Sequence, residues 1–144
     1  MDKKAFVLSL LLMSNILPGA CHGQQNEAEY LGLGLELYGK SRFEEAIRVF
    51  SHGISVYSGN ARLYLHRGNA YYSKSDFISA INDFTAECAL DPGFALAYYN
   101  RAVAYYCAQD YGRAWQDIRV ARSLGYRMCP DFIEQLKEDS GIQH

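Results

Sequence analysis

Residues 61–94 read ARLYLHRGNAYYSKSDFISAINDFTAECALDPGF and carry the clearest structural pattern in the chain. In its first half, Tyr64, Gly68 and Tyr71 recur at intervals of three and four residues, the spacing of one face of an α-helix. The second half carries a similar apolar pattern that ends at Asp91-Pro92, where proline stops a helix. Residues 61–94 are therefore predicted to form two helices separated by a short turn.

The same pattern occurs three times without gaps, each time after the interval that separates Tyr30 from Tyr64. The aligned columns are Tyr30/Tyr64/Tyr98, Gly34/Gly68/Ala102, Tyr38/Tyr72/Tyr106, Phe43/Phe77/Tyr111, Ala46/Ala80/Ala114, Ile47/Ile81/Trp115 and Phe50/Phe84/Ile118. A glycine inside a helix costs about 1 kcal/mol relative to alanine, so Gly34 and Gly68 indicate that two helices approach closely there. The chain is therefore expected to be an array of repeated helix pairs.

This period and these columns closely resemble the tetratricopeptide repeat, whose pattern is an aromatic residue, Leu-Gly, Tyr, then Ala, Phe, Ala and Pro. The three units are residues 27–60, 61–94 and 95–128. The resemblance implies an all-α fold, an α-α superhelix (solenoid) of three helix-turn-helix units. One departure is Glu87, because the family has a small residue in that place, as Gly53 and Ala121 are in the other units.

The last unit needs a cover, because each unit buries its apolar face only against a neighbour. Residues 129–144 contain Pro130, which is tolerated in the first turn of a helix, followed by Phe132, Ile133 and Leu136 on one side. This segment is therefore predicted to form a C-terminal capping helix and a short tail.

No equivalent segment precedes the first unit. Its outer face, around Tyr30, Leu33 and Leu37, is a candidate surface for contact with a second copy of the chain. The alternative to a binding module is therefore a self-associating structural spacer, a homo-oligomer built through this face.

In the family, the first helix of each pair lines the concave side of the superhelix, and this resemblance identifies a candidate peptide-binding groove. Its lining residues are Leu31, Leu35, Tyr38, Leu65, His66, Asn69, Tyr72, Leu96, Tyr99, Asn100, Val103 and Tyr106. The rings would hold side chains of an extended or helical peptide, and Asn69 and Asn100 would hydrogen-bond its backbone. The alternative is that these tyrosines and leucines only pack against the next helix.

One activity of the family is disfavoured by the residues themselves. Some members clamp the C-terminal carboxylate of a cytosolic chaperone with lysine, asparagine and arginine side chains. The corresponding places here are Leu31, Leu35, His66, Leu96 and Asn100. Because these places hold no cation to balance a buried carboxylate, binding of a chaperone tail is not expected.

Charge and composition exclude other classes of function. Fourteen basic and sixteen acidic residues give a net charge of −2, so no cationic excess indicates nucleic acid as a partner. The four histidines, His22, His52, His66 and His144, are not at metal-ligand spacing. No nucleophile, base and acid can be assembled into a catalytic set either. The sequence therefore predicts a chain without catalytic activity, metal or cofactor, whose partner is a protein or peptide.

The first twenty residues are expected to be an export signal. A short charged start precedes an apolar run from Ala5 to Leu17, which is too short to span a bilayer. The exit Leu17-Pro18-Gly19-Ala20-Cys21 resembles a bacterial lipoprotein site, which implies lipidation of Cys21, a signal peptide over 1–20 and a tether over 21–26. Pro18 departs from that pattern, so cleavage by ordinary signal peptidase is the alternative.

The chain is therefore expected in the bacterial cell envelope, scaffolding a complex while its lipidated N-terminus anchors it to a membrane facing the periplasm or the exterior. In the alternative it is a soluble secreted or periplasmic protein. The remaining cysteines, Cys88, Cys107 and Cys129, are odd in number and are interpreted as small buried side chains.

Overall fold

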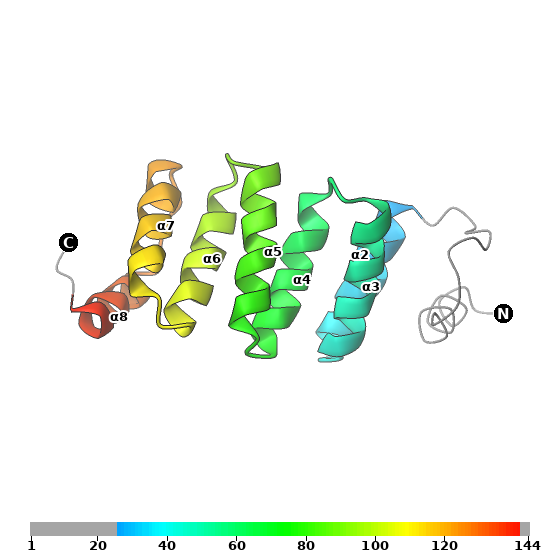
Figure 1. The fold of residues 1–144 in the computed structure, drawn as a ribbon, viewed down its shortest axis with the longest axis horizontal. Helices are drawn as coiled ribbons and strands as arrows, with labels where there is room; N and C mark the ends of the chain where they lie inside the picture. Colours follow the sequence, from blue (N-terminus) through cyan, green and yellow to red (C-terminus); the bar gives the residue numbers. More distant parts are fainter. Residues whose placement is uncertain (1–25, 142–144) are drawn as a thin grey trace.

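The structure, a computed structural model, describes residues 26–141, and all regular elements in that range are helices. They are α2 (Glu27–Gly39), α3 (Phe43–Val56), α4 (Ala61–Ser73), α5 (Phe77–Leu90), α6 (Ala95–Cys107), α7 (Tyr111–Ser123) and α8 (Pro130–Ser140). Figure 1 shows the helices in a row in chain order, with α8 tilted at the far end. The predicted all-α solenoid of helix pairs with a C-terminal helix is confirmed.

Short polar side chains fix where the helices begin. Four of them accept a hydrogen bond from a backbone N–H group in the first turn, which satisfies a donor that the helix itself leaves unpaired. These caps are Asn26 of α2, Asn60 of α4, Asp76 of α5 and Asp110 of α7. The helix starts are therefore encoded locally in the sequence.

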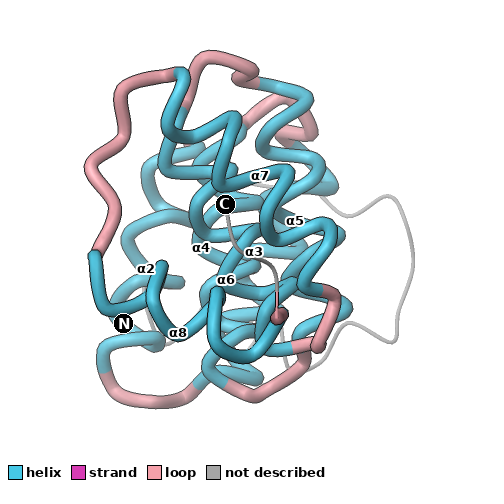
Figure 2. Tube along the Cα trace, turned by 90° about the vertical axis from the view of Figure 1, so that its left-hand side faces the viewer, coloured by secondary structure: helices cyan, strands magenta, loops and turns pink. Residues whose placement is uncertain are grey.

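The helices form two layers (Figure 2). The first helices of the units, α2, α4 and α6, lie in one layer, and α3, α5 and α7 lie in the other. Each helix packs against its chain neighbours in the opposite layer. We call the outward surface of the first layer the α2–α4–α6 face, and it corresponds to the predicted groove.

The two layers approach closely at the glycine column, as the sequence predicts. A Cβ atom on Gly34 would overlap with the ring of Phe50, and one on Gly68 would lie 2.7 Å from Cε1 of Phe84. In the third unit the column holds Ala102, and the phenylalanine is replaced by the smaller Ile118 in the same core cluster. A larger residue on one helix is thus matched by a smaller one on the other.

Two buried ion pairs between the layers were not predicted from the sequence. Arg67 donates two hydrogen bonds to the carboxylate of Asp83, from Nε at 2.8 Å and from Nη2 at 2.7 Å. Its Nη1 donates to Oγ of Ser51 in the preceding unit at 2.9 Å. The same set recurs one unit later as Arg101, Asp117 and Thr85. Each arginine therefore joins its own unit to the one before.

Glu87, the departure from the family pattern, is buried on α5 of the second unit. Only 1% of its surface is exposed, and its Oε2 atom has no hydrogen-bond partner. Burial, together with the negative charge of Asp91, raises the pKa of Glu87 to about 7. The equivalent Gly53 packs against Leu63, whereas in the next unit Ala97 holds the place of Leu63, which leaves room for the longer side chain.

Helix α8 closes the C-terminal end of the core, which confirms the predicted cap. Leu136 is fully buried in a cluster that includes Trp115, and Nε1 of Trp115 donates to Oγ of Ser140 at 3.1 Å. The outward side of α8 carries exposed carboxylates, including Glu134 and Glu138. The array therefore ends in a polar surface.

The predicted signal peptide, residues 1–20, and the lipidation site Cys21 lie outside the described residues. In the part of the chain that the structure does describe, no helix combines the length and apolar character that crossing a membrane requires. Cys88 is buried, Cys107 is half-buried, Cys129 is exposed, and all three are free thiols. The interpretation of Cys129 as a buried side chain is wrong, because it lies at the N-cap of α8.

Candidate peptide-binding face

All twelve predicted groove residues lie on α2, α4 and α6. Leu35 is the most exposed of them, at 39% of its surface. The half-buried ones are Tyr38, Leu65, His66, Asn69, Tyr72, Leu96, Tyr99, Asn100, Val103 and Tyr106. The α2–α4–α6 face is therefore made of side chains that are partly packed and still partly in contact with solvent.

Leu31 does not line this face. It is 5% exposed and belongs to the core cluster of the first unit, together with Phe50 and Leu63. It supports the face from beneath and offers almost no surface to a ligand, contrary to the prediction.

The column of Tyr38, Tyr72 and Tyr106 has a structural role. Each phenol hydrogen-bonds to the following helix of the first layer or, for the last one, to α8. The bonds join Tyr38 to Oγ of Ser73 at 2.9 Å, Tyr72 to Sγ of Cys107 at 3.5 Å and Tyr106 to Oδ2 of Asp139 at 2.5 Å. These contacts favour the alternative interpretation, helix packing, for this column.

The hydrogen bonds also raise the pKa of two of these phenols further above neutral pH. The bond to Cys107 and burial raise the pKa of Tyr72 to about 12. The bond to Asp139 is the main cause that raises the pKa of Tyr106 to about 12. Neither tyrosine therefore adds charge to the face near neutral pH.

Rings cover the C-terminal end of the face. Tyr99 lies 4.8 Å from Tyr126 and 5.7 Å from Phe132 of α8, measured between ring centroids. Phe132 also lies 5.4 Å from Tyr106, edge to face. Helix α8 thus occupies part of the third unit's aromatic surface, and the first two units keep the more open part of the face.

The polar groups of the face are neutral and in part unsatisfied. His66 stacks on Phe50 at 5.9 Å between ring centroids, which fixes its ring. Burial, followed by the positive charge of Arg62, lowers the pKa of His66, so its ring is uncharged at pH 7. Among residues 26–141, the side-chain amides of Asn69 and Asn100 have no hydrogen-bond partner. They are free to donate to and accept from a ligand backbone.

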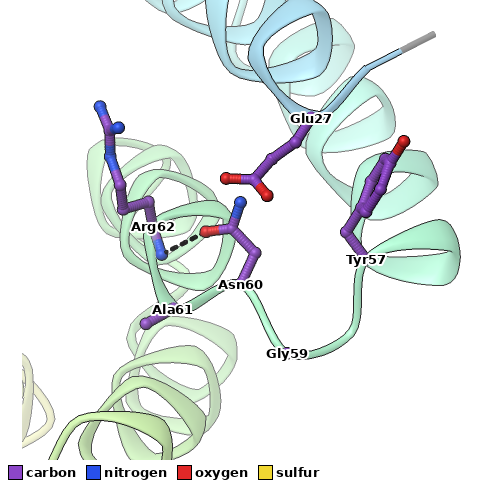
Figure 3. A pocket seen from close by; sticks show the side chains of 6 residues that line it. All are labelled: Glu27, Tyr57, Gly59, Asn60, Ala61 and Arg62. Atoms are coloured by element: carbon purple, nitrogen blue, oxygen red, sulfur yellow. Dashed lines mark hydrogen bonds between the residues drawn. The ribbon is translucent and has the colours of Figure 1, made fainter.

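A small open hollow of about 370 Å³ lies at one edge of the molecule, between the start of α2 and the turn from α3 to α4 (Figure 3). Glu27 and Arg62 stand on opposite sides of it, and the Nδ2 atom of Asn60 has no hydrogen-bond partner there. None of its lining residues is among the predicted groove residues. The hollow is therefore distinct from the predicted groove, although Glu27, Ala61 and Arg62 belong to the first turns of α2 and α4.

The outer face of the first unit is not the apolar surface that self-association requires. Tyr30 and Leu37 are each 3% exposed and pack in the core of their own unit. The outward side of α2 carries Glu29, Glu36 and Lys40, with Lys40 paired to Glu36 at 3.0 Å. The residues that correspond to Glu29 in the next two units are Leu63 and Ala97, and those that correspond to Glu36 are Ala70 and Ala104. All four are fully buried.

The N-terminal face is therefore its own polar cap. This finding corrects the expectation of an uncapped end and removes the apolar contact on which the structural-spacer alternative depends.

Reactive groups do not gather on the α2–α4–α6 face. Among residues 26–141, no group of three or more histidine, cysteine or acidic side chains could hold a metal ion. The two buried aspartates, Asp83 and Asp117, each form an ion pair with an arginine. What the face offers is shape, apolar contact and neutral hydrogen-bonding groups.

Comparison with known proteins identifies the fold. No protein-family model and no curated protein sequence matches the chain. Among solved structures it is similar to the first tetratricopeptide-repeat domain of Spaghetti (RPAP3) bound to the HSP90 peptide SRMEEVD. That match has a TM-score of 0.73 and 22% identity, and it covers 85% of this chain and 97% of the other.

Two further solved domains are similar over most of their length. The TPR2B domain of yeast Sti1, in a pHsp70 complex, has a TM-score of 0.70 and 25% identity, covering 80% of this chain and 95% of that one. The Arabidopsis OM64 TPR domain has a TM-score of 0.73 and 22% identity, covering 78% and 94%. The resemblance to the tetratricopeptide repeat that the sequence columns predict is confirmed.

Proposed function

We propose that this chain, which has the tetratricopeptide-repeat fold, is a non-catalytic interaction scaffold that binds a peptide segment of a partner protein on its α2–α4–α6 face. The observation that carries this proposal is the set of uncharged, partly exposed side chains on three adjacent helices, including Leu35 and the unpaired amides of Asn69 and Asn100. Apolar side chains gathered with a few polar groups on one face are typical of a recognition surface.

The similar solved domains support peptide recognition as a use of this fold. One is bound to an HSP90 peptide and another is in a pHsp70 complex. The chaperone peptide itself is not the proposed ligand, because SRMEEVD is acidic and the places that correspond to the lysine, asparagine and arginine clamp of other family members hold no cation here; they include Leu35, His66 and Leu96. The ligand is therefore a segment of different chemistry.

The sequence of the N-terminus supports a proposal for where in the cell the chain binds its partner. The export-like residues 1–20 and the lipobox-like approach to Cys21 support a lipid-anchored scaffold of an envelope complex. Acyl chains contribute about 0.8 kcal/mol per buried methylene, so a multiply acylated Cys21 would hold the chain stably on a membrane. Mass spectrometry of the mature N-terminus tests this: acylated Cys21 is expected, and an unmodified start at His22 or Gln24 rejects the anchor.

Site-specific photo-crosslinking tests the binding face. A photo-reactive amino acid replaces Asn69 on α4 in the full chain, and in a matched variant it replaces Asn82, which is exposed on α5 in the other layer. After irradiation, capture from membranes should give a protein adduct from position 69 and none from position 82. Equal adducts from both positions, or an adduct from position 82 alone, would place the partner elsewhere.

A further inference from the structure

We infer that the α2–α4–α6 face selects an uncharged segment that presents aliphatic side chains along one side, and that it discriminates against acidic segments and free C-terminal carboxylates. This inference rests on the proposed function, since it names the ligand class of the same face.

Three leucines form an oblique apolar line across the face. Counted from residues 27, 61 and 95, Leu35, Leu65 and Leu96 hold the ninth, fifth and second places of their units. The steps of four and three residues each correspond to about one helical turn of 5.4 Å. Since α2, α4 and α6 follow one another along the row in Figure 1, the leucines descend by one turn from unit to unit.

This line is available to a ligand. Leu35 is 39% exposed, and Leu65 and Leu96 are half-buried, so each keeps part of its surface in contact with solvent. A segment that crosses the face obliquely would cover these exposed parts with its own aliphatic side chains. The hydrophobic effect rewards that contact in proportion to the apolar area removed from water, without a need for charge.

Neutral polar groups accompany the leucines. His66 and Asn100 hold the sixth place of their units, at the same level on adjacent helices of the layer, and Asn69 lies one turn further along α4 from His66. The amides can each donate and accept a hydrogen bond, and His66 is held uncharged by its surroundings. These groups suit the backbone N–H and C=O of a peptide, which carry no net charge.

A carboxylate would find no adequate partner on this face. Arg62 is an exposed cation in the first turn of α4, and it lines the same hollow as Glu27 (Figure 3). An acid bound in this hollow beside Arg62 would therefore share the hollow with the carboxylate of Glu27. Further along the face, an acid would lose its water against leucine and neutral histidine, which is unfavourable without a counter-charge.

Selection from a random peptide library displayed against the full chain tests the inference. The enriched peptides should be rich in leucine, isoleucine or valine, with a net charge near zero. Their affinity should change less than about twofold between low and high salt, because no ion pair is screened. The free peptide SRMEEVD should bind at least about tenfold more weakly than the best enriched peptide.

Two matched variants locate the contact. Leu35→Glu on α2 should weaken the binding of the best enriched peptide at least about tenfold. Val56→Glu, at a 51% exposed apolar residue on α3, should change that affinity less than about twofold. Because Leu35 is already exposed, the variant should fold, and Leu35→Ser provides a second, uncharged test with a smaller loss.

The outcomes separate this inference from the proposed function. If no peptide is enriched, the proposed peptide-binding function itself fails. If acidic peptides are enriched, or SRMEEVD binds as tightly as the best of them, the ligand class is wrong although the scaffold function stands. Equal losses in the Leu35 and Val56 variants would overturn the assignment to this face.

Discussion

Replacing Arg67 by leucine measures how much the first buried ion pair contributes to joining the units. Arg67 gives two hydrogen bonds to Asp83, whose side chain is almost entirely out of contact with water. Removing the guanidinium leaves a buried carboxylate without its counter-charge, which costs about 3–5 kcal/mol. Domains of this size are stable by about 5–15 kcal/mol, so Arg67→Leu should lower the stability severely.

The first unit has two apolar residues where the second unit has the Arg67–Asp83 ion pair. Leu33 and Val49 hold the places of Arg67 and Asp83 one unit earlier, and Val49 is 2% exposed in the core. Because this apolar pair fits the same place between two helices, the double variant R67L/D83V should lie within about 1 kcal/mol of the wild type, or be more stable. The two substitutions should therefore be coupled by about 3 kcal/mol.

Urea unfolding followed by far-UV circular dichroism measures the effect on the wild type, both single variants and the double variant. The equivalent pair, Arg101 and Asp117, should give the same pattern and serves as an internal repeat of the experiment. If Arg67→Leu has a free energy of unfolding within about 1 kcal/mol of the wild type, the unpaired Asp83 carboxylate is not costly. If the double variant is as unstable as Arg67→Leu, the apolar pair does not substitute for the ion pair.

Three more substitutions probe the packing. Glu87 keeps its proton up to about pH 7 in the folded chain but loses it near pH 4.5 in the unfolded chain, so up to about 3 kcal/mol of stability is lost as pH rises through this window. Glu87→Gln should remove that loss. The unfolding midpoints of the variant and the wild type should therefore diverge between pH 5 and pH 8. Gly34→Ala should lower the melting temperature despite its better helix propensity, since the new Cβ meets the ring of Phe50, and adding Phe50→Ile, the third unit's combination, should restore most of the loss. Leu136→Ala should cost about 2–5 kcal/mol and speed amide hydrogen exchange in α7 and α8, whereas unchanged exchange would mean that α8 is not the cap.

The repeat columns made the fold predictable from the sequence. Each column records packing between helices that are close in the chain, so the pattern of Gly34 with Phe50, repeated one unit later as Gly68 with Phe84, carries the contact in its own spacing. The capping helix was predictable for a similar reason, because Leu136 and its neighbours form an apolar side at the point where the repeats end.

The ion pairs were harder to predict, although their signal is present. An arginine, an aspartate and a hydroxyl residue recur at the repeat interval, but the sequence does not say that Arg67 points between the layers toward Asp83. The prediction of an apolar N-terminal face failed because Tyr30 was assigned to the outside of α2, whereas it packs inward. A comparison of Glu29 with Leu63 and Ala97 would have indicated the polar cap.

The site was only partly predictable. The resemblance assigned the groove residues to the first helix of each unit, and the structure places all twelve on α2, α4 and α6. Half-burial alone does not distinguish a residue that could contact a ligand from one that packs against the next helix. Tyr72 belongs to the second kind, since its hydroxyl bonds to Cys107, and Leu31 lies beneath the surface altogether. The exposed Leu35, the half-buried Leu65 and Leu96, and the unpaired amides of Asn69 and Asn100 remain as residues that a ligand could contact.

Binding on the α2–α4–α6 face is tested most directly by a map of backbone amide chemical shifts on the 16.3 kDa chain, titrated with the best library-selected peptide. We expect the largest changes on α2, α4 and α6, around Leu35, Leu65 and Asn69, and no change on the exposed side of α3, α5 and α7. Changes centred on the exposed surface of α5, around Ile78 and Asn82, would contradict binding on this face.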